Sequence, residues 1–422
     1  MKNIKENNTT NFYKFACITM IWITDLYSSI IQYKYFTIQN GMLFLGVAIL
    51  LFYYLFNSEK PYSFREELAV ESIYMLVFMA YMLSFGTIVS INKQAHLSQL
   101  LTSLEYLFIL IVVSSLIKGS GTEAFHLLLF SRAIILAIVF LLKPVYVGGG
   151  RYAISLDMNS NGLGMSFAAG IWGILYEQQK RRLPFLFTMA FIALFGYCIL
   201  QTGSRKSLIA AGLIIFLWLI FCFFPTLKEK GGIQGFISFA IMVTLILFIG
   251  MAFLSEYSNS TMSNRMEQLQ YETSEGNRSQ MYRAGLDMIK NSPLFGIGFQ
   301  GFKQLYGHYS HATIIEIPVS GGIIGTIIYF YVYFVSIKRT ILAFKTTRGT
   351  SEFIREHNTI KMIIILWVVI LFYTICIIHP YQYGSHVLLG IIFGEVSYIE
   401  KKTEVLRKDT TSITTESRYI KA

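Results

Sequence analysis

The sequence has 422 residues, of which 54% are hydrophobic and only 14% are charged, with a formal net charge of +11. Soluble domains carry about 25% charged residues, so this composition excludes an ordinary water-soluble protein. The apolar runs are continuous rather than alternating, which predicts helices, and a helix needs about 20 apolar residues to cross a bilayer. The positive charge then concerns membrane topology rather than nucleic-acid binding.

The predicted fold class is all-α: a polytopic helical membrane protein with about 12 transmembrane helices and one large extracytoplasmic loop. We expect a single integral membrane domain over residues 1–400. A disordered cytoplasmic tail is expected at 401–422, which is rich in Lys, Thr and Ser. The four cysteines lie inside apolar runs without a CxxC spacing, which predicts small buried side chains. The predicted spans are 12–29, 41–56, 68–90, 97–117, 122–142, 159–176, 184–201, 204–225, 233–254, 311–337, 359–378 and 381–399.

Charge indicates the orientation of these spans. An even number of spans places both termini on one side, and 22 of the 35 Lys and Arg residues then fall on that side, against 11 on the other. Cytoplasmic segments collect Lys and Arg, so both termini are predicted to be cytoplasmic. The cations that remain on the outer side are not required by topology, and they are candidates for binding an anionic partner.

Two outer elements in the first half of the chain carry such cations. Residues 143–158 contain a glycine run followed by Arg151, and Arg205 and Lys206 stand at the outer start of a helix. A helix N-terminus attracts anions, so cations there are unfavourable unless an anion completes the set. Arg205 is therefore a candidate for bidentate phosphate binding, the alternative being an arginine that snorkels to the membrane interface.

The outer loop at 255–310 is longer than most connections between helices, which predicts a structured functional element. Within it, the sequence predicts a helix over 277–291 that begins at Asn277 with a capping-box spacing. Its apolar and charged faces are typical of a helix lying on the outer bilayer surface or over a cavity. Arg278 falls on the apolar face and is a candidate for an anionic contact. Arg283 falls on the charged face, where a solvated role is the alternative.

The next helix begins beside His311. Glu316 follows five residues later, and Pro318 and the pair Gly321-Gly322 permit a bend or close packing. Histidine titrates near neutral pH and can act as a general base. The alternatives are an interfacial structural histidine and, with His308 three residues earlier, a metal site that lacks a third ligand.

These elements, in this order, resemble the O-antigen ligase and polysaccharide polymerase (Wzy-type) family. The segment from Asn277 resembles the family's Arg-led helix, which runs into a Pro-Leu-x-Gly-x-Gly turn, here at 293–298. His311, Glu316, Gly322 and Gly325 keep the family's His–x4–Glu–x5–Gly–x2–Gly spacing. The resemblance spans residues 151–325.

Two shorter elements extend the resemblance. The Ser-Arg pair at 204–205 begins a helix, as it does in the family. Arg151, followed by Asn161-Gly162-Leu163-Gly164, is similar to an earlier Arg…Asn element of the family. The sequence departs from the family at three positions on the acceptor side of the site, where the family commonly has Asn, Trp and Glu: Ala312, Tyr282 and Ser320.

The resemblance implies an enzyme, a membrane glycosyltransferase that acts at the outer face of the bacterial cytoplasmic membrane. Its reaction would be the polymerisation of undecaprenyl-pyrophosphate-linked oligosaccharide repeat units into capsular, exopolysaccharide or O-antigen chains, without a cofactor or metal. In that reaction Arg205 and Arg278 would bind the donor pyrophosphate, with Arg283 and Arg151 as secondary candidates. His311 would be the catalytic base, and Glu316 and Asn161 supporting residues.

The implied partners are the lipid-linked donor and acceptor, membrane lipids, a flippase and a chain-length regulator, with no nucleic acid. A ligase that moves the finished glycan to another acceptor is the nearest alternative, since the motifs are shared. A transporter or flippase of an anionic substrate is a further alternative. Broken helices with facing half-helix ends, and inverted repeats, would favour transport; no such pairing is evident in the sequence.

Overall fold

The protein is described here by a computed structural model covering Thr19 and residues 68–120, 124–148, 151–155, 159–180, 183–225 and 277–419. The side chains of 119, 120, 124, 277, 278 and 406–419 are not described. The predicted spans at 41–56 and 233–254, and the span at 12–29 apart from Thr19, lie outside the described residues.

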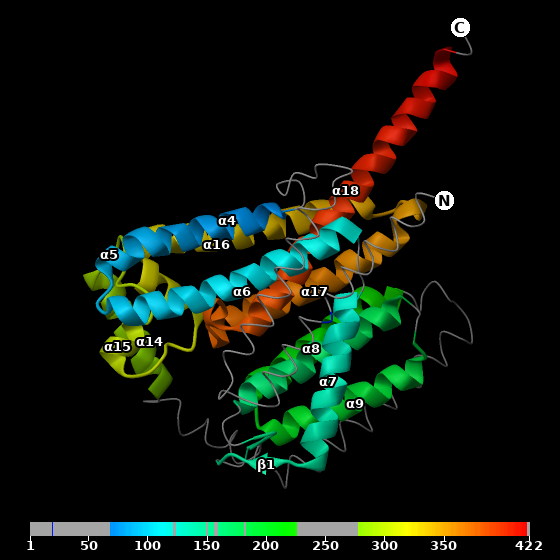
Figure 1. Ribbon diagram of the computed structural model, residues 1–422. Coiled ribbons are helices and arrows are strands. Elements are labelled where there is room, and N and C mark those ends of the chain that lie inside the picture. Colours follow the sequence, from blue (N-terminus) through cyan, green and yellow to red (C-terminus); the bar gives the residue numbers. More distant parts are fainter. Residues whose placement is uncertain are drawn as a thin grey trace. The chain divides into compact units, whose positions relative to one another are not determined.

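The described residues are almost entirely helical, as predicted (Figure 1). Seven segments among them are long and apolar enough to cross a membrane: Val70–Val89, Lys93–Lys118, Phe125–Leu142, Phe185–Thr202, Arg205–Phe223, Thr313–Thr347 and Ser351–Cys376. These seven agree in position with seven of the predicted spans. Two further helices, α8 (Ser160–Gln179) and α18 (Tyr383–Tyr419), occupy the predicted spans at 159–176 and 381–399 without belonging to the seven. The described residues therefore support a polytopic helical membrane protein but do not establish a count of 12.

The chain divides into two compact units, where the sequence suggested one continuous domain. The first comprises the described residues of 123–284 together with Val368–Cys376. The second comprises the described residues of 62–122, Gly285–Trp367 and 377–422. The sequences of apolar helices of similar length do not show which helices pack together, so this division was not predictable from hydropathy.

In the first unit, α8 packs against three neighbours, α7 (Ala124–Leu142), α9 (Phe185–Thr202) and α10 (Arg205–Trp218, continued by the π-helical turn η2, Leu219–Phe223). Trp172 of α8 is fully buried. Gly170 and Gly173 allow the close approach, because a Cβ on Gly170 would overlap Ala133, and one on Gly173 would lie 2.8 Å from the carbonyl of His126. Small residues are the usual means by which membrane helices approach closely. At one end of this unit, β1 (Val145–Tyr146) pairs antiparallel with β2 (Tyr152–Ala153).

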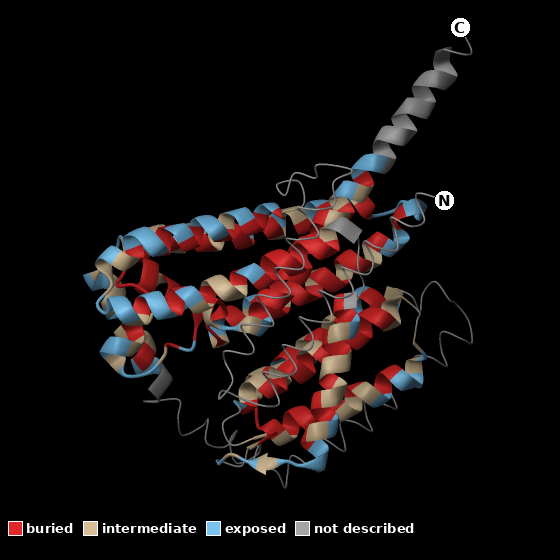
Figure 2. Cartoon of the chain, in the orientation of Figure 1, coloured by how far each residue is buried: buried red, intermediate tan, exposed pale blue. Residues whose placement is uncertain are grey.

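The second unit contains α4 (Val70–Tyr81, continued by η1, Met82–Gly86, and α5, Thr87–Val89), α6 (Lys93–Ser120), α16 (Thr313–Thr347) and α18. It also holds the second half of α14 (Asn277–Asn291), from Gly285 onward, and most of α17 (Ile354–Cys376, preceded by η3, Ser351–Phe353). The short helices α15 (Gly301–Tyr306) and η4 (His379–Tyr381) complete the unit. Exposed residues follow the outward faces of α4 and α6, and buried residues lie on their inner sides (Figure 2). The exposed side chains are largely apolar, among them Val77 and Leu101, as expected of a surface that faces lipid.

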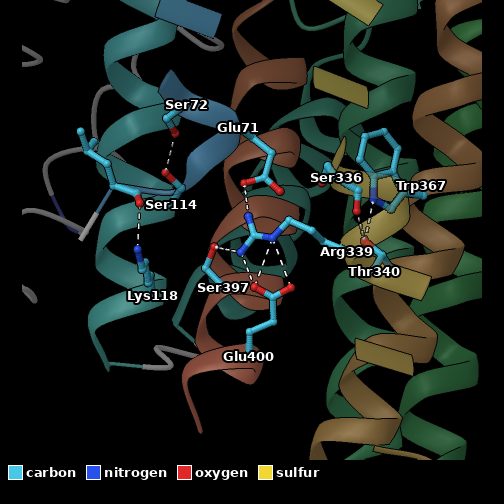
Figure 3. Close-up of polar contacts among 11 residues, drawn as sticks. Glu71, Ser72, Ser114, Lys118, Ser336, Arg339, Thr340, Trp367, Ser397 and Glu400 are labelled. Carbon is cyan, nitrogen blue, oxygen red and sulfur yellow. Dashed lines mark hydrogen bonds and ion pairs between the residues drawn. The ribbon is translucent and has the colours of Figure 1, made fainter. Parts of the chain in front are cut away.

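A partly buried ion-pair network joins α4, α16 and α18 (Figure 3). Arg339 of α16 donates to Glu71 of α4 at 2.5 Å, and it pairs with Glu400 and donates to Ser397 of α18 at 3.2 Å. The predicted span ends at 337, which leaves Arg339 in a loop, but α16 continues to Thr347. The two carboxylates compensate the charge of Arg339 in these extra turns, and of the two only Glu71 is fully buried.

The structure also differs from the expectation of a disordered tail beyond Lys401. The helix α18 continues to Tyr419. In its first turn beyond the predicted span, Lys402 pairs with Glu356 of α17 and Thr403 is buried. These contacts extend the helix past residue 400, and neither is visible in the local composition on which the expectation rested.

Candidate functional site

The predicted helix over 277–291 is confirmed as α14, Asn277–Asn291. Its charged face is exposed at Arg283, and Lys290 forms an ion pair with Asp287 at 3.4 Å while both remain largely in solvent. On the apolar face Met281 is buried, but Leu286 is 51% exposed. The side chain of Arg278 lies outside the described residues. Arg283 therefore has a solvated environment, which was the alternative to an anionic contact for this residue. The role of Arg278 stays a prediction.

The helix α16 is broken at Gly322, whose backbone angles are φ 62° and ψ −164°. Only glycine adopts this region readily. The break leaves a half-helix, 313–321, whose last carbonyls receive hydrogen bonds from elsewhere. Val319 and Ser320 accept from the backbone N–H groups of Ile297 and Gly298, each at 2.9 Å.

Two further contacts complete the packing of this break. The carbonyl of Gly321 accepts from the hydroxyl of Tyr81 at 2.8 Å. The N–H of Ile323, beyond the break, donates to the carbonyl of Pro293 at 2.8 Å. The Pro-Leu-x-Gly-x-Gly turn is thus the segment that lies along the broken helix and satisfies its backbone groups, as a buried helix end requires.

His311 stands two residues before the half-helix and is exposed, with a positive φ of 56°. Positive φ is uncommon for a residue other than glycine, so the surrounding contacts must hold it. The preceding residue, Ser310, is fully buried, and its hydroxyl donates to Glu316 Oε2 at 2.6 Å. Glu316 is also fully buried. Glu316 therefore fixes the segment that presents His311, and its carboxylate is not part of the exposed surface.

The other oxygen of Glu316 is held by η4. The Tyr381 hydroxyl donates to Glu316 Oε1 at 2.9 Å and accepts from the backbone N–H of Gln300 at 3.2 Å. His96 of α6 accepts from the neighbouring N–H of Phe299 at 2.8 Å. The segment that leads to His311 is thus tied to α6, α16 and η4 through both backbone and side-chain hydrogen bonds.

A buried histidine lies on the same short helix as Tyr381. The Nδ1 atom of His379 is 2.6 Å from the Tyr333 hydroxyl, and its backbone N–H donates to Thr313 Oγ1 at 2.9 Å. Desolvation by burial lowers the pKa of His379 to about 3, with a smaller contribution from His386. His379 is therefore neutral at physiological pH, and it anchors η4 to the first residue of the half-helix.

In the first unit, Arg205 is the first residue of α10, and Gly203, with φ 62°, makes the sharp turn from α9. The α8 N-terminus lies against this turn: a Cβ on Gly164 would be 2.8 Å from Ser207 Oγ. The Ser207 hydroxyl donates to the carbonyl of Asn161 at 3.4 Å. The structure thus places Asn161 beside the turn that carries Arg205.

Arg151 lies in the hairpin at this end of the first unit. Its backbone carbonyl accepts from Val147 at 2.9 Å, and its N–H donates to Gly148 at 3.2 Å. The strand β2 beside it contacts α8 and α9. Arg151, Asn161 and Arg205 are therefore grouped by their elements at one end of the first unit, and His311 and Glu316 are grouped in the second.

Sequence reasoning missed several residues that build the second group, notably His96, Tyr381 and His379. Each contacts the His311 segment or the half-helix from a part of the chain far away in sequence. Tyr381 and Glu316, for example, are 65 positions apart. Local spacing contains no signal for such pairs.

One comparison with known proteins gives a match. Residues 189–330 match the family model described as O-antigen ligase. No curated protein sequence matches the chain. The matched region runs from α9 into α16, so it includes Arg205, Arg278, Arg283, His311 and Glu316 and excludes Arg151 and Asn161. The resemblance drawn from the sequence motifs is thereby confirmed over this region.

Proposed function

We propose, from the premise that this chain carries the domain of the O-antigen ligase and polymerase family at residues 189–330, that it polymerises lipid-linked glycan repeat units. The donor would be an oligosaccharide on undecaprenyl pyrophosphate at the outer face of the bacterial cytoplasmic membrane. The acceptor would be a hydroxyl of a second repeat unit. The observation that carries the proposal is the family match across a region that begins before Arg205 and ends after the half-helix of His311.

The chemistry needs two kinds of group. The acceptor hydroxyl attacks the anomeric carbon of the donor, and its proton passes to the neutral imidazole of His311. The bond between sugar and phosphate breaks, and undecaprenyl pyrophosphate leaves with additional negative charge. Arginine forks can stabilise that charge as it grows. Arg205 and Arg278 are proposed for this role, with Arg151 and Arg283 as secondary candidates.

The geometry of the His311 segment supports the assignment of a base. His311 is exposed, while Ser310 and Glu316 beside it are fully buried and hydrogen-bonded. A catalytic group works best when its supporting contacts fix it before substrate arrives. Glu316 is proposed as that support. Asn161 is proposed as a support for the turn of Arg205, since its backbone carbonyl accepts from the Ser207 hydroxyl.

A ligase is the second candidate, and the description of the matched family model favours it. A ligase would use the same donor and the same groups on the pyrophosphate, and it would differ in the acceptor. The departures from the family pattern at Ala312, Tyr282 and Ser320 fall on the acceptor side, so they concern this choice.

Transport is less well supported than transfer. The described residues contain one broken helix, α16, and transporters use the open carbonyls of such breaks to coordinate ions. Here the carbonyls of Val319, Ser320 and Gly321 each accept a hydrogen bond from Ile297, Gly298 or Tyr81. The break is used for packing the loop that leads to His311.

The proposal is tested with purified protein in liposomes, supplied with undecaprenyl-pyrophosphate repeat units extracted from cells that lack the gene. A polymerase produces a ladder of lipid-linked products that differ by one repeat unit. A ligase produces no ladder but transfers the glycan to an added envelope lipid acceptor. Unchanged repeat units in both assays would contradict the proposed function.

A further inference from the structure

Lys303 is a cation that the proposed function has not used. It lies in α15 of the second unit, where Gly307, with φ 86°, ends the helix and donates to the carbonyl of Lys303 at 2.8 Å. The side chain is neither buried nor fully exposed. In Figure 1, α15 lies beside α14, at the end of the second unit where α5 and the start of α6 also lie.

The ammonium group of Lys303 is held by Tyr309. Lys303 Nζ lies 4.6 Å from the centre of the Tyr309 ring and 3.4 Å from its hydroxyl. A cation over an aromatic face gains about 0.5–1 kcal/mol at an exposed site, and it keeps its other N–H groups available. Tyr309 therefore orients the charge without neutralising it.

Tyr309 in turn rests on the network that presents His311. Its ring meets the Tyr381 ring edge to face, with centroids 5.9 Å apart. Tyr381 donates to Glu316, which also accepts from Ser310. Lys303 is thus connected, through two aromatic side chains, to the contacts that fix the residue before His311.

No carboxylate pairs with Lys303 within the part of the chain that the structure describes. The stretch from Asn291 to Ile315 contains no Asp or Glu. The next acid, Glu316, is buried, with both oxygens accepting hydrogen bonds from hydroxyls. By contrast, Lys290 of α14 pairs with Asp287. Lys303 is thus an oriented cation without an acidic partner among the described residues, in the segment that leads to the candidate base His311. Such a group is suited to bind an anion from outside the chain.

We propose that Lys303, oriented by Tyr309, is an anion-binding residue on the His311 side of the site. The identity of its ligand rests on the proposed function. The ligand is an anionic oxygen group of the lipid-linked glycan. Two sources share this chemistry: the pyrophosphate of the donor, and a carboxylate of an acidic sugar in the repeat unit. Lys303 then determines which lipid-linked glycans bind, and it takes no part in proton transfer.

The test measures binding without turnover, using full-length protein in lipid nanodiscs. One probe is undecaprenyl pyrophosphate without sugar, and the other is a soluble trimer of galacturonic acid, with its neutral methyl ester as reference. Lys303→Gln should weaken binding of one of the two acidic probes by about tenfold, the scale of one charge-assisted hydrogen bond. Tyr309→Leu, which keeps the charge but releases it, should cause a smaller loss for the same probe.

Lys290→Gln is the matched control, because it removes a lysine of the same outer segment that already has a carboxylate partner. Its affinities should equal those of the wild type. A loss for undecaprenyl pyrophosphate assigns Lys303 to the donor, and a loss for the galacturonate trimer alone assigns it to the glycan.

Equal affinities of Lys303→Gln and wild type for both probes, or no binding of either by the wild type, would contradict the proposal. If binding depends on Lys303 but the protein neither polymerises nor transfers glycan, the proposed anion site is supported and the proposed function is contradicted.

Discussion

At the scale of single residues, Arg205 and Arg278 differ from lysine in geometry rather than in charge. A guanidinium presents a planar fork to two phosphate oxygens, whereas an ammonium is a point charge. We therefore predict that Arg205→Lys and Arg278→Lys each impair polymerisation, although the net charge is unchanged. The measurement is the length distribution of the cell-surface polysaccharide when each variant is the only copy of the gene.

Protein level is the necessary control, since Arg205 begins α10 and a folding defect would also shorten the polysaccharide. Arg283→Lys on the exposed face of α14 provides a comparison in a solvated setting, and a weaker effect is expected there. Wild-type length distributions from both Arg205→Lys and Arg278→Lys, at equal protein level, would refute the phosphate role.

At the scale of elements, the break in α16 depends on Gly322. A Cβ at this position would overlap the carbonyl of Leu294, and the backbone angles are accessible only to glycine without strain. We predict that Gly322→Ala lowers the stability of the folded protein by more than about 2 kcal/mol, combining strain with overlap. Thermal unfolding of the purified variant in nanodiscs measures the loss.

Gly384→Ala is the matched control for that prediction. It lies at the start of α18 in the same unit, and its Cβ would meet nothing within 4 Å. Alanine favours a helix over glycine by about 1 kcal/mol, so this variant should be as stable as wild type or slightly more stable. If Gly322→Ala unfolds at the same temperature as Gly384→Ala, the half-helix does not require its glycine.

The elements also show what the sequence can and cannot indicate. The helix over 277–291 was predictable because its faces and its terminal residues are local signals, and α14 has these bounds. Pro318 and the pair Gly321-Gly322 permitted a bend or close packing for the same reason, and α16 is broken at Gly322. The clamp on Glu316 was not predictable, because Tyr381 comes from another part of the chain. Nor was the length of α16, because Arg339 looks like a loop residue until Glu71 and Glu400 are placed beside it.

At the scale of the whole molecule, the orientation in the membrane is a prediction from charge. The segment at 255–310 should face outward and both termini should face the cytoplasm. A single cysteine at Asn291, the exposed end of α14, should react with an impermeant thiol reagent on intact cells when the four native cysteines are replaced. A cysteine at Ser351, which is exposed at the opposite end of α16, should react only after permeabilisation. The reverse pattern of labelling would overturn the orientation.

The proposed function requires that both kinds of group, the phosphate-binding cations and the base, act on one substrate. The family pattern linked Asn161 with Arg151 and His311 with Glu316, and the roles of these residues stay predictions. Their joint action on one lipid-linked glycan is the central claim, and it distinguishes an enzyme from a protein that only binds or moves the glycan.

The most direct measurement is turnover by purified His311→Ala with lipid-linked repeat units, alongside donor binding by the same preparation. A general base typically contributes 10²–10⁴-fold, so turnover should fall by about that factor while donor binding is retained. His308→Ala, an exposed neighbour three residues earlier, should lose much less. Turnover by His311→Ala near the wild-type rate across pH 6–8 would contradict the assignment of His311 as the base and would favour a transporter.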